Sequence, residues 1–285
     1  MTEPVATEVI KEEHGGLAAG RWVGRLRRSL TRLSPNQLRV ISILVTLIVW
    51  EWYGRSVDPL FFSYPTAIAM AIPSMVLEGN LLPALAGSLL VLAIGWTVAF
   101  GLGVILGIFM GRYELFDNLL EWQVAALYST PDVALIPLLI LWFGFGLKAK
   151  AFVVIYAVIF PIIINTYTGV RDVSAGLVDV ARAEGAGEFK VLRTIVIPSA
   201  APLILTGMKV SVGRAVVGMV VAEMLMVISG LGGLVVFYGN QFATDKLLVI
   251  VIILALLGIG LTQLVELLER VLVPWAVSQQ ANGEN

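Results

Sequence analysis

The sequence predicts an all-α, polytopic membrane protein with about six transmembrane helices and a cytoplasmic loop of short helices. Hydrophobic residues make up 58% of its 285 residues and charged residues only 14%, whereas a soluble globular domain carries roughly 25% charged residues. The mean hydropathy is +0.91. Uncharged runs recur along the chain, and several approach or exceed the roughly 20 residues that cross a bilayer as a helix. The surplus apolar side chains must therefore face lipid.

Six runs are candidate spans. The first, 38–53, is short, so Arg39 must extend along the helix to reach one bilayer surface, and aromatic residues mark the other. Pro131, Asp132 and Pro137 interrupt the third, which predicts a broken helix there. The six candidates are residues 38–53, 79–111, 122–147, 151–170, about 203–228 and 247–265.

The distribution of basic residues predicts the orientation, because Lys and Arg are retained on the cytoplasmic side. With six spans and the N-terminus inside, thirteen of the nineteen fall in cytoplasmic segments and four in outer segments, while Lys209 and Arg214 lie within the fifth span. We expect both termini in the cytoplasm, with a basic segment 1–36, a membrane domain 37–275 and a tail 276–285. The N-terminal arginines either set the topology or form an amphipathic helix on the inner leaflet.

Composition also excludes several kinds of site. The chain has no cysteine, which excludes disulfides and metal sites with thiolate ligands. Its one histidine, His14, has no second histidine with which to complete a metal site. No carboxylates cluster as they would in a catalytic centre. No Gly-x-x-x-x-Gly-Lys-Ser/Thr run, whose backbone amides and lysine would hold nucleotide phosphates, occurs anywhere. We expect no catalytic residue, metal or cofactor in this chain and no nucleic-acid partner, so it is not predicted to be an enzyme.

Small residues recur every four positions along the second span. They are Gly95, Ala99, Gly103, Gly107 and Gly111. Such a ridge lets a second helix backbone approach closely. The sequence leaves open whether that second helix belongs to this chain or to another copy.

The segment between the fourth and fifth spans, about 171–202, is long, mixed in charge and patterned as helix. A first helical face ends at Gly185, a residue expected at a helix C-terminal turn, and a second stops at Pro198. The two faces comprise Leu177, Val180, Ala181 and Glu184, and then Phe189, Leu192 and Val196. Two short amphipathic helices of this kind suit docking into a groove of another protein.

The same segment carries a fixed spacing. It reads Asp179-Val180-Ala181, three residues, Gly185, nine residues, Ile195, one residue, Ile197-Pro198. This resembles the cytoplasmic signature of binding-protein-dependent ABC importer permeases, which is Glu-Ala-Ala, three residues, Gly, nine residues, Ile, one residue, Leu-Pro. Asp179, Val180 and Ile197 depart from that signature by conservative replacements.

Shorter matches extend the resemblance over most of the chain after residue 50 and bring it closest to the branch that imports nitrate, taurine and alkanesulfonates. They are Trp50-Glu51-Trp52, Tyr64-Pro65-Thr66, Pro137-Leu138-Leu139, Trp142-Phe143-Gly144, Phe160-Pro161 with Asn165, Ala222-Glu223, Ser229-Gly230-Leu231-Gly232 and Ala243-Thr244-Asp245.

The resemblance implies a transport subunit in a bacterial plasma (inner) membrane that forms the pathway for a small anionic or organic solute. It implies three partners besides the bilayer: an ABC ATPase dimer that binds ATP and Mg, a second permease copy or a paralogue, and an extracytoplasmic solute-binding protein. The residues expected to couple the chain to the ATPase are Asp179, Ala181, Arg182, Glu184, Gly185, Ile195 and Pro198.

Charged and polar residues within the spans are candidates for the translocation pathway, namely Asp132, Asn165, Arg214 and Glu223. Arg214 lies deep in the fifth span, where a charge is costly unless it faces protein or water. It either attracts an anionic solute or makes a structural bond to helix carbonyls, to Asn165 or to a carboxylate. Asp132 lies at the predicted helix break, and Glu223 cannot reach Arg214 along one helix. Lys209 is expected to extend to the inner boundary.

Two other classes of function compete with this interpretation. An ATP-independent secondary transporter or channel would need ion-coupling carboxylates in mid-span and no cytoplasmic partner. A membrane-embedded enzyme would need a catalytic constellation that the sequence does not offer. Co-purification with an ATPase subunit separates the first interpretation from both.

Overall fold

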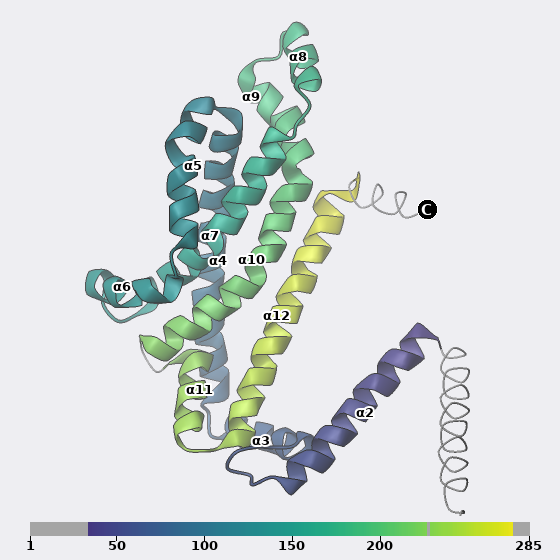
Figure 1. The fold of residues 1–285 in the computed structure, drawn as a ribbon, viewed down its shortest axis with the longest axis vertical. Coiled ribbons are helices and arrows are strands. Elements are labelled where there is room, and N and C mark those ends of the chain that lie inside the picture. Colours follow the sequence, from purple (N-terminus) through teal and green to yellow (C-terminus); the bar gives the residue numbers. More distant parts are fainter. Residues whose placement is uncertain (1–33, 227–228, 276–285) are drawn as a thin grey trace, which may run out of the picture. The chain divides into compact units, whose positions relative to one another are not determined.

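The computed structural model describes residues 34–226 and 229–275. The chain divides into two compact units, Met1–Thr66 and Ala67–Asn285. Figure 1 shows the helices of both. The second unit holds the long apolar helices and is the one that positions the candidate sites.

The described part of the first unit is a helix followed by a return loop. Helix α2 (Pro35–Ser56) begins with a capping box, in which the side chains of Ser34 and Gln37 each accept a hydrogen bond from the other's backbone N–H. Near its end, Glu51 accepts hydrogen bonds from the backbone N–H and the hydroxyl of Thr66, at 3.0 and 2.7 Å. Two of the short matched segments are thereby brought together, because Glu51 caps the start of α3 (Pro65–Leu77).

Among the described residues, four helices are long and apolar enough to cross a membrane, or five if a bent pair counts as one span. The four are α4 (Leu81–Arg112), α7 (Leu147–Arg171), the continuous helical segment Glu188–Leu225 that contains α10 (Ile197–Leu225), and α12 (Thr244–Leu272). They correspond to the second, fourth, fifth and sixth predicted spans. Helix α2 is not among them, so a total of six remains a prediction.

The third predicted span is broken, as expected. Helix α5 (Glu114–Ser129) is bent by 92° from the segment Asp132–Phe143, which consists of a 3₁₀ turn (Asp132–Leu135) and α6 (Ile136–Phe143). The residue before Pro131, Thr130, is extended because the proline ring disfavours a helical conformation there. Pro137 was wrongly expected to interrupt the helix, since it lies in the first turn of α6, where a missing N–H costs no helical bond.

The glycine ridge of α4 packs against α7 of the same chain. A β-carbon on Gly107 would lie 2.6 Å from Cβ of Thr166 and 2.8 Å from the backbone oxygen of Ile163, which leaves no room for a side chain. Gly95, Gly103 and Gly111 meet Val154, Ile162 and Val170 in the same way. The residue numbers rise together along both helices, so α4 and α7 run parallel. The helix that packs against the ridge therefore belongs to this chain and not to another copy.

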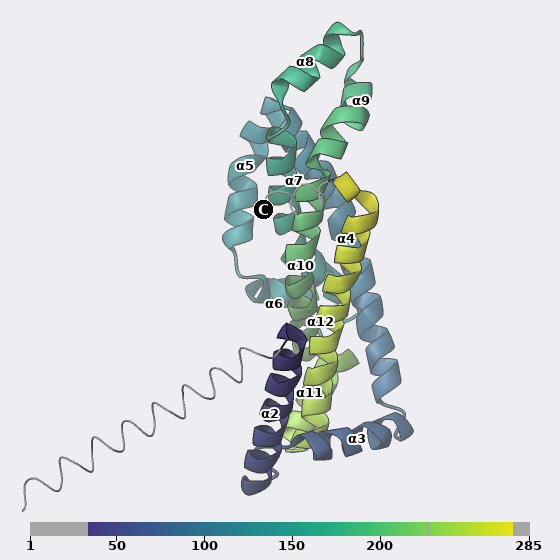
Figure 2. The same cartoon turned by 90° about the vertical axis from the view of Figure 1, so that its right-hand side faces the viewer.

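Helix α10 packs against the same α7 in the opposite direction. Gly169 of α7 lies against Leu203 and Ala200, whereas Gly207 lies against Asn165 and Pro161. The buried core between α4, α7 and α10 includes Trp96, Ala99, Val154, Ile162, Ala215 and Met219. Figure 2 shows α12 beside α10, where Lys209 bonds Glu269 at 3.1 Å and lies 3.7 Å from Glu266.

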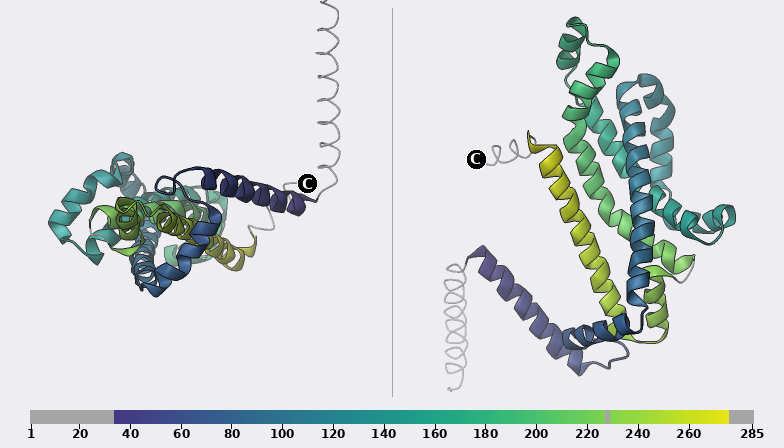
Figure 3. Two further views of the ribbon diagram at one scale, coloured as in Figure 1. Left: turned by 90° about the horizontal axis from the view of Figure 1, so that it is seen from below. Right: turned by 180° about the vertical axis from the view of Figure 1, so that it is seen from behind.

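The second unit has two distinct ends, visible in Figures 1 and 3. One end carries the 171–202 loop, with α8 (Ala175–Ala183) and α9 (Glu188–Val191). The opposite end carries α11 (Gly230–Asn240), a short helix between α10 and α12 that the sequence interpretation did not anticipate. Helix α4 joins the two ends, since it contacts α11 near its start and the loop at Arg112.

Candidate functional site

The first loop helix ends as the sequence predicts. Gly185 has φ of +80°, in the left-handed region that favours glycine. Its N–H donates to the carbonyl of Arg182, and the N–H of Ala186 donates to the carbonyl of Ala181, both at 2.9 Å. This pair of bonds is a Schellman motif, which closes α8 and turns the chain toward α9.

One side of α8 is buried and the other presents apolar side chains to the outside. Val178 is buried with Val191 and Val196 beneath the loop. Leu177 and Val180 on α8 are 56% and 65% exposed, and Phe189 on α9 is 75% exposed. The candidates Asp179, Arg182 and Glu184 are exposed in the same loop, whereas Ala181 and Ile195 are partly buried. The loop thus presents a mixed apolar and charged surface.

Of the second predicted face of the loop, Leu192 and Val196 pack inward as expected, but Phe189 does not. Residues Leu192–Val196 form a π-helical turn between α9 and α10, in which the N–H of Ile197 reaches the carbonyl of Leu192. The buried residues are Val191 and Val196, five apart, whereas Phe189 points outward. The helix also does not stop at Pro198, which lies in the first turn of α10. A wider turn makes room for the proline ring, which would otherwise clash with the carbonyl four residues earlier.

Glu188 ties the loop to the membrane helices. Its carboxylate accepts hydrogen bonds from Arg112 at the end of α4, at 2.6 Å, and from two nitrogens of Arg182 on α8, at 2.6 and 3.0 Å. The bonds from Arg182 and Arg112 lower the pKa of Glu188. The bridge is therefore fully ionised at neutral pH and is lost only as the pH falls through that lowered pKa. Sequence reasoning missed Glu188, because its partner Arg112 lies on a different helix.

Asp179 lies at a small cavity beside this bridge. The cavity measures about 200 Å³, and its lining includes Asp179, Arg112, Arg171 and Arg182. Arg171 also bonds Asp117 of α5 at 2.9 Å. Ion pairs thus connect the end of α4 to the loop and the end of α7 to α5.

We expect Glu188→Gln to loosen the loop without unfolding the protein. The amide removes the negative charge that two arginines share, and α8 then loses its polar tie to α4. Hydrogen–deuterium exchange at the α8 amides should become several-fold faster, while the thermal midpoint of the whole chain stays unchanged. Glu184→Gln, an exposed carboxylate in the same loop, is the control. Equal exchange rates in both variants would contradict the tie.

The four candidate pathway residues do not form one cluster. The guanidinium of Arg214 lies over the ring of Tyr128 on α5, 5.0 Å from its centroid. The side-chain amide of Asn165 donates to the carbonyl of Pro161 at 2.8 Å, and Asp132 accepts from the N–H of Val133 at 2.9 Å. Arg214 therefore makes a cation–π contact with a residue of another helix, which sequence spacing could not predict.

Glu223 is in a different environment, because its side chain is only 1% exposed. It bonds Ser88 of α4 and the backbone of Gly232 in α11. Ser88 was not predicted, and Lys150, counted among the outer basic residues, is 8% exposed in the first turn of α7. A buried polar cluster thus lies at the α11 end of the second unit.

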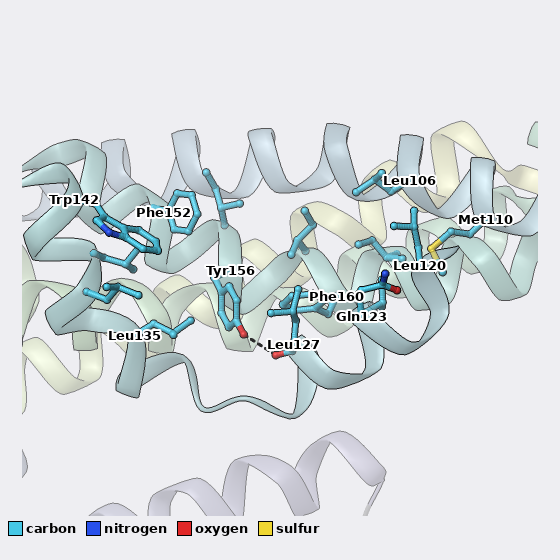
Figure 4. Close-up of a pocket in the computed structure, with 16 residues that line it drawn as sticks. Leu106, Met110, Leu120, Gln123, Leu127, Leu135, Trp142, Phe152, Tyr156 and Phe160 are labelled. Carbon is cyan, nitrogen blue, oxygen red and sulfur yellow. Dashed lines mark hydrogen bonds between the residues drawn. The ribbon is translucent and has the colours of Figure 1, made fainter. Parts of the chain in front are cut away.

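An apolar cleft lies between α4, α5, α6 and α7 (Figure 4). It measures about 490 Å³ and is lined by aliphatic and aromatic residues, among them Leu106, Trp142 and Phe160. The hydroxyl of Tyr156 donates to the carbonyl of Leu127 at 2.6 Å, so this polar atom is satisfied within the chain. None of the lining residues is charged. The cleft suits apolar groups and offers an anion no counter-charge.

The chain is similar to several transport proteins along most of its length. SsuC of Bacillus subtilis (strain 168), whose name assigns it to aliphatic sulfonates transport, is 32% identical over 238 residues, which cover 83% of this chain and 86% of SsuC. The taurine transport system permease protein TauC of Escherichia coli (strain K12) is 29% identical, over 90% of this chain and 93% of TauC. The formylaminopyrimidine transport permease protein ThiX of Halalkalibacterium halodurans is 28% identical, over 89% of this chain and 100% of ThiX.

Solved structures share the fold at lower identity. A chain of the MetNI methionine ABC transporter in an inward-facing conformation superposes with a TM-score of 0.51 at 19% identity, covering 68% of this chain and 97% of that chain. A chain of an amino acid ABC transporter gives a TM-score of 0.50 at 17% identity, covering 71% and 96%. The model of the family described as "Binding-protein-dependent transport system inner membrane component" matches residues 100–275. The chain therefore belongs to this family and is a transmembrane permease subunit of an ABC importer.

Proposed function

We propose that this permease carries a small organic anion and that organosulfonates are the class to test first. Two of the relatives described above are named for aliphatic sulfonates and taurine, which share a sulfonate group. Arg214 supports an anionic solute. It lies within a long apolar helix, and no carboxylate within the described residues 34–226 and 229–275 lies within ion-pairing distance of it. A sulfonate would supply the missing negative charge.

The 171–202 loop is the proposed docking surface for a separate ATPase. The observation that carries this proposal is the exposure of Leu177, Val180 and Phe189 among charged residues, at the position of the family's signature spacing. The exposed apolar side chains would fill a groove, and Asp179, Arg182 and Glu184 would form its polar rim. The remaining residues expected to act in coupling shape the loop, namely Ala181, Gly185, Ile195 and Pro198.

ATP and Mg would bind to the ATPase partner and not to this chain. Closure of an ATPase dimer would move the loop, and the Glu188 bridge to Arg112 and Arg182 would pass that movement to α4. The continuous helical segment Glu188–Leu225 would carry it through the membrane. The pathway would then open alternately to the two sides as helices move as rigid bodies.

The proposed assembly contains two permeases, either two copies of this chain or this chain with a paralogue, above an ATPase dimer. A solute-binding protein would deliver the solute at the outer face. The protein would lie in a bacterial plasma membrane with both termini cytoplasmic. Residues 1–36 would form a basic cytoplasmic segment, 37–275 the membrane domain and 276–285 a cytoplasmic tail. Asp132, Asn165, Arg214 and Glu223 would act in or beside the pathway.

The test is uptake of labelled taurine and ethanesulfonate into proteoliposomes that contain the permease with its ATPase and binding protein. We expect ATP-dependent uptake, and we expect Arg214→Gln to raise the KM for transport at least about 10-fold, equivalent to about 1.4 kcal/mol of lost binding. Lys209→Gln is the control, because Lys209 already pairs with Glu269. Uptake without ATP would overturn the coupling proposal, and normal KM and Vmax in Arg214→Gln would remove this residue from the pathway.

A further inference from the structure

Helix α11 begins directly on a buried carboxylate. The backbone N–H of Gly232, in the first turn of α11, donates to Oε2 of Glu223 at 3.0 Å. The hydroxyl of Ser88 on α4 lies 2.8 Å from both carboxylate oxygens, and its oxygen accepts the N–H of Leu231 at 2.8 Å. Glu223 is 1% exposed and Ser88 is fully buried. One carboxylate and one hydroxyl therefore join α4, α10 and α11.

Two glycines make this arrangement possible. Gly230 has φ of +65°, and a β-carbon there would lie 2.1 Å from Oε1 of Glu223. A β-carbon on Gly232 would lie 2.5 Å from the backbone oxygen of Val220. Any side chain at either position would push α11 away from α10. The two glycines of the Ser-Gly-Leu-Gly segment are therefore required because the backbone of α11 approaches α10 and its carboxylate closely.

A buried cation lies beside the carboxylate. Lys150, on α7, is 8% exposed and donates to the hydroxyl of Ser229, the residue that precedes α11. A buried carboxylate requires hydrogen bonds, and Ser88 and Gly232 donate them to Glu223 here. The cluster therefore connects α11 to all three central helices, α4, α7 and α10.

Glu223 lies at the far end of the helical segment that begins in the 171–202 loop, so the cluster can receive a movement of that loop. The helical segment Glu188–Leu225 runs without a break from the 171–202 loop to this point. At 1.5 Å per residue, Glu188 and Glu223 are about 50 Å apart along the helix. Glu188 is the ionic tie at the loop end, and Glu223 is the polar tie at the α11 end.

We propose that Glu223, with Ser88 and Lys150, is the positioning residue that fixes α11 to α10, so that movement received at the loop carries α11 with it. The proposal rests on the proposed role of the loop in coupling. Glu223 does not contact the solute in this assignment. It determines whether α11, at the end opposite the loop, moves together with α10.

The fixation of α11 can be measured directly, because the chain has no native cysteine to remove. Cysteines at Leu89 on α4 and Phe237 on α11, 41% and 45% exposed, take spin labels for pulsed dipolar spectroscopy. We expect one narrow distance distribution in the parent and a broad or double distribution in Glu223→Gln. The glutamine amide has only one acceptor oxygen, so its NH₂ group faces either the hydroxyl of Ser88 or the N–H of Gly232, and that donor loses its acceptor. Glu78→Gln, which loses only a surface pair with Lys246, is the control and should stay narrow.

Coupling supplies a readout that a purely structural role would not change. In proteoliposomes of the full complex, we expect at least about 10-fold more ATP to be hydrolysed per taurine taken up when the permease carries Glu223→Gln. The reason is that α11 no longer moves with the loop. Loss of folded protein alone would lower both rates and leave their ratio unchanged. Should Glu223→Gln fail to reach the membrane, Ser88→Ala removes the acceptor for Leu231 without altering any charge, and the same two readouts apply.

The possible outcomes separate the proposals. A narrow distribution and an unchanged ATP-to-taurine ratio in both Glu223→Gln and Ser88→Ala would overturn the positioning role. A parent complex that hydrolyses no ATP would instead contradict the proposed function of the loop, and the distance measurements alone would then decide whether Glu223 fixes α11.

Discussion

Replacing Gly107 by valine should prevent the central helices from assembling. The glycine faces Thr166 and the backbone of Ile163 on α7, and a β-carbon would lie 2.6 Å from Cβ of Thr166. Two parallel helices would have to separate along their whole contact, because Gly95, Gly103 and Gly111 make equally close approaches. Overpacking of this kind costs about 3 kcal/mol at the upper end of the usual range. We expect little monodisperse protein after extraction into detergent, measured by fluorescence-detected size-exclusion chromatography.

The same helix provides a matched control. Gly101 lies between Gly95 and Gly107 in α4, and a β-carbon there would meet nothing within 4 Å. Gly101→Val adds the same atoms to the same helix and removes the same backbone freedom, so it should leave the yield and the thermal midpoint nearly unchanged. If both variants were equally damaging, the cause would be valine within α4 and not the contact with α7.

Phe189→Asp should abolish transport without destabilising the permease. Phe189 is 75% exposed on α9, so a carboxylate there remains in water when the chain is alone. An aromatic residue at the centre of an interface contributes about 2 to 4 kcal/mol to binding, which corresponds to a roughly 30- to 1000-fold loss of affinity. We expect the ATPase to be absent from the purified complex and taurine uptake to fall to background, with an unchanged thermal midpoint.

A conservative variant tests whether the apolar character of Phe189 is what matters. Phe189→Leu keeps an apolar side chain at the same position, so the complex should be retained and uptake should fall less than about 10-fold. Retention of the ATPase by Phe189→Asp would show that the ATPase does not bind to this part of the loop. It would leave the membership of the chain in its family untouched.

Much of the membrane architecture could be predicted because it depends on local composition. Long uncharged runs form helices wherever they occur, since a backbone in lipid must satisfy its own hydrogen bonds. The break at Pro131 and the turn at Gly185 follow from the backbone restrictions of proline and glycine and needed no tertiary information. The fold class and the family signature followed from the same kind of observation.

The errors arose where a local pattern has two structural solutions. Pro198 was expected to end a helix, but a π-helical turn at Leu192–Val196 widens the backbone and lets the helix continue into α10. That turn also changes the spacing of buried residues from four to five, so Val191 and Val196 are buried and Phe189 is not. Short α11 was missed because its apolar, glycine-rich sequence resembles the continuation of a span.

The amino-acid sequence was sufficient to predict a helical membrane permease, because hydropathy and the signature spacing are properties of consecutive residues. Three features required the folded structure: the glycine ridge of α4 packs against α7, Arg214 lies over Tyr128, and Glu223 holds the start of α11. These contacts join residues from separate helices. Their partners are chosen by how the helices pack against one another, and helical periodicity along one segment carries no information about that choice.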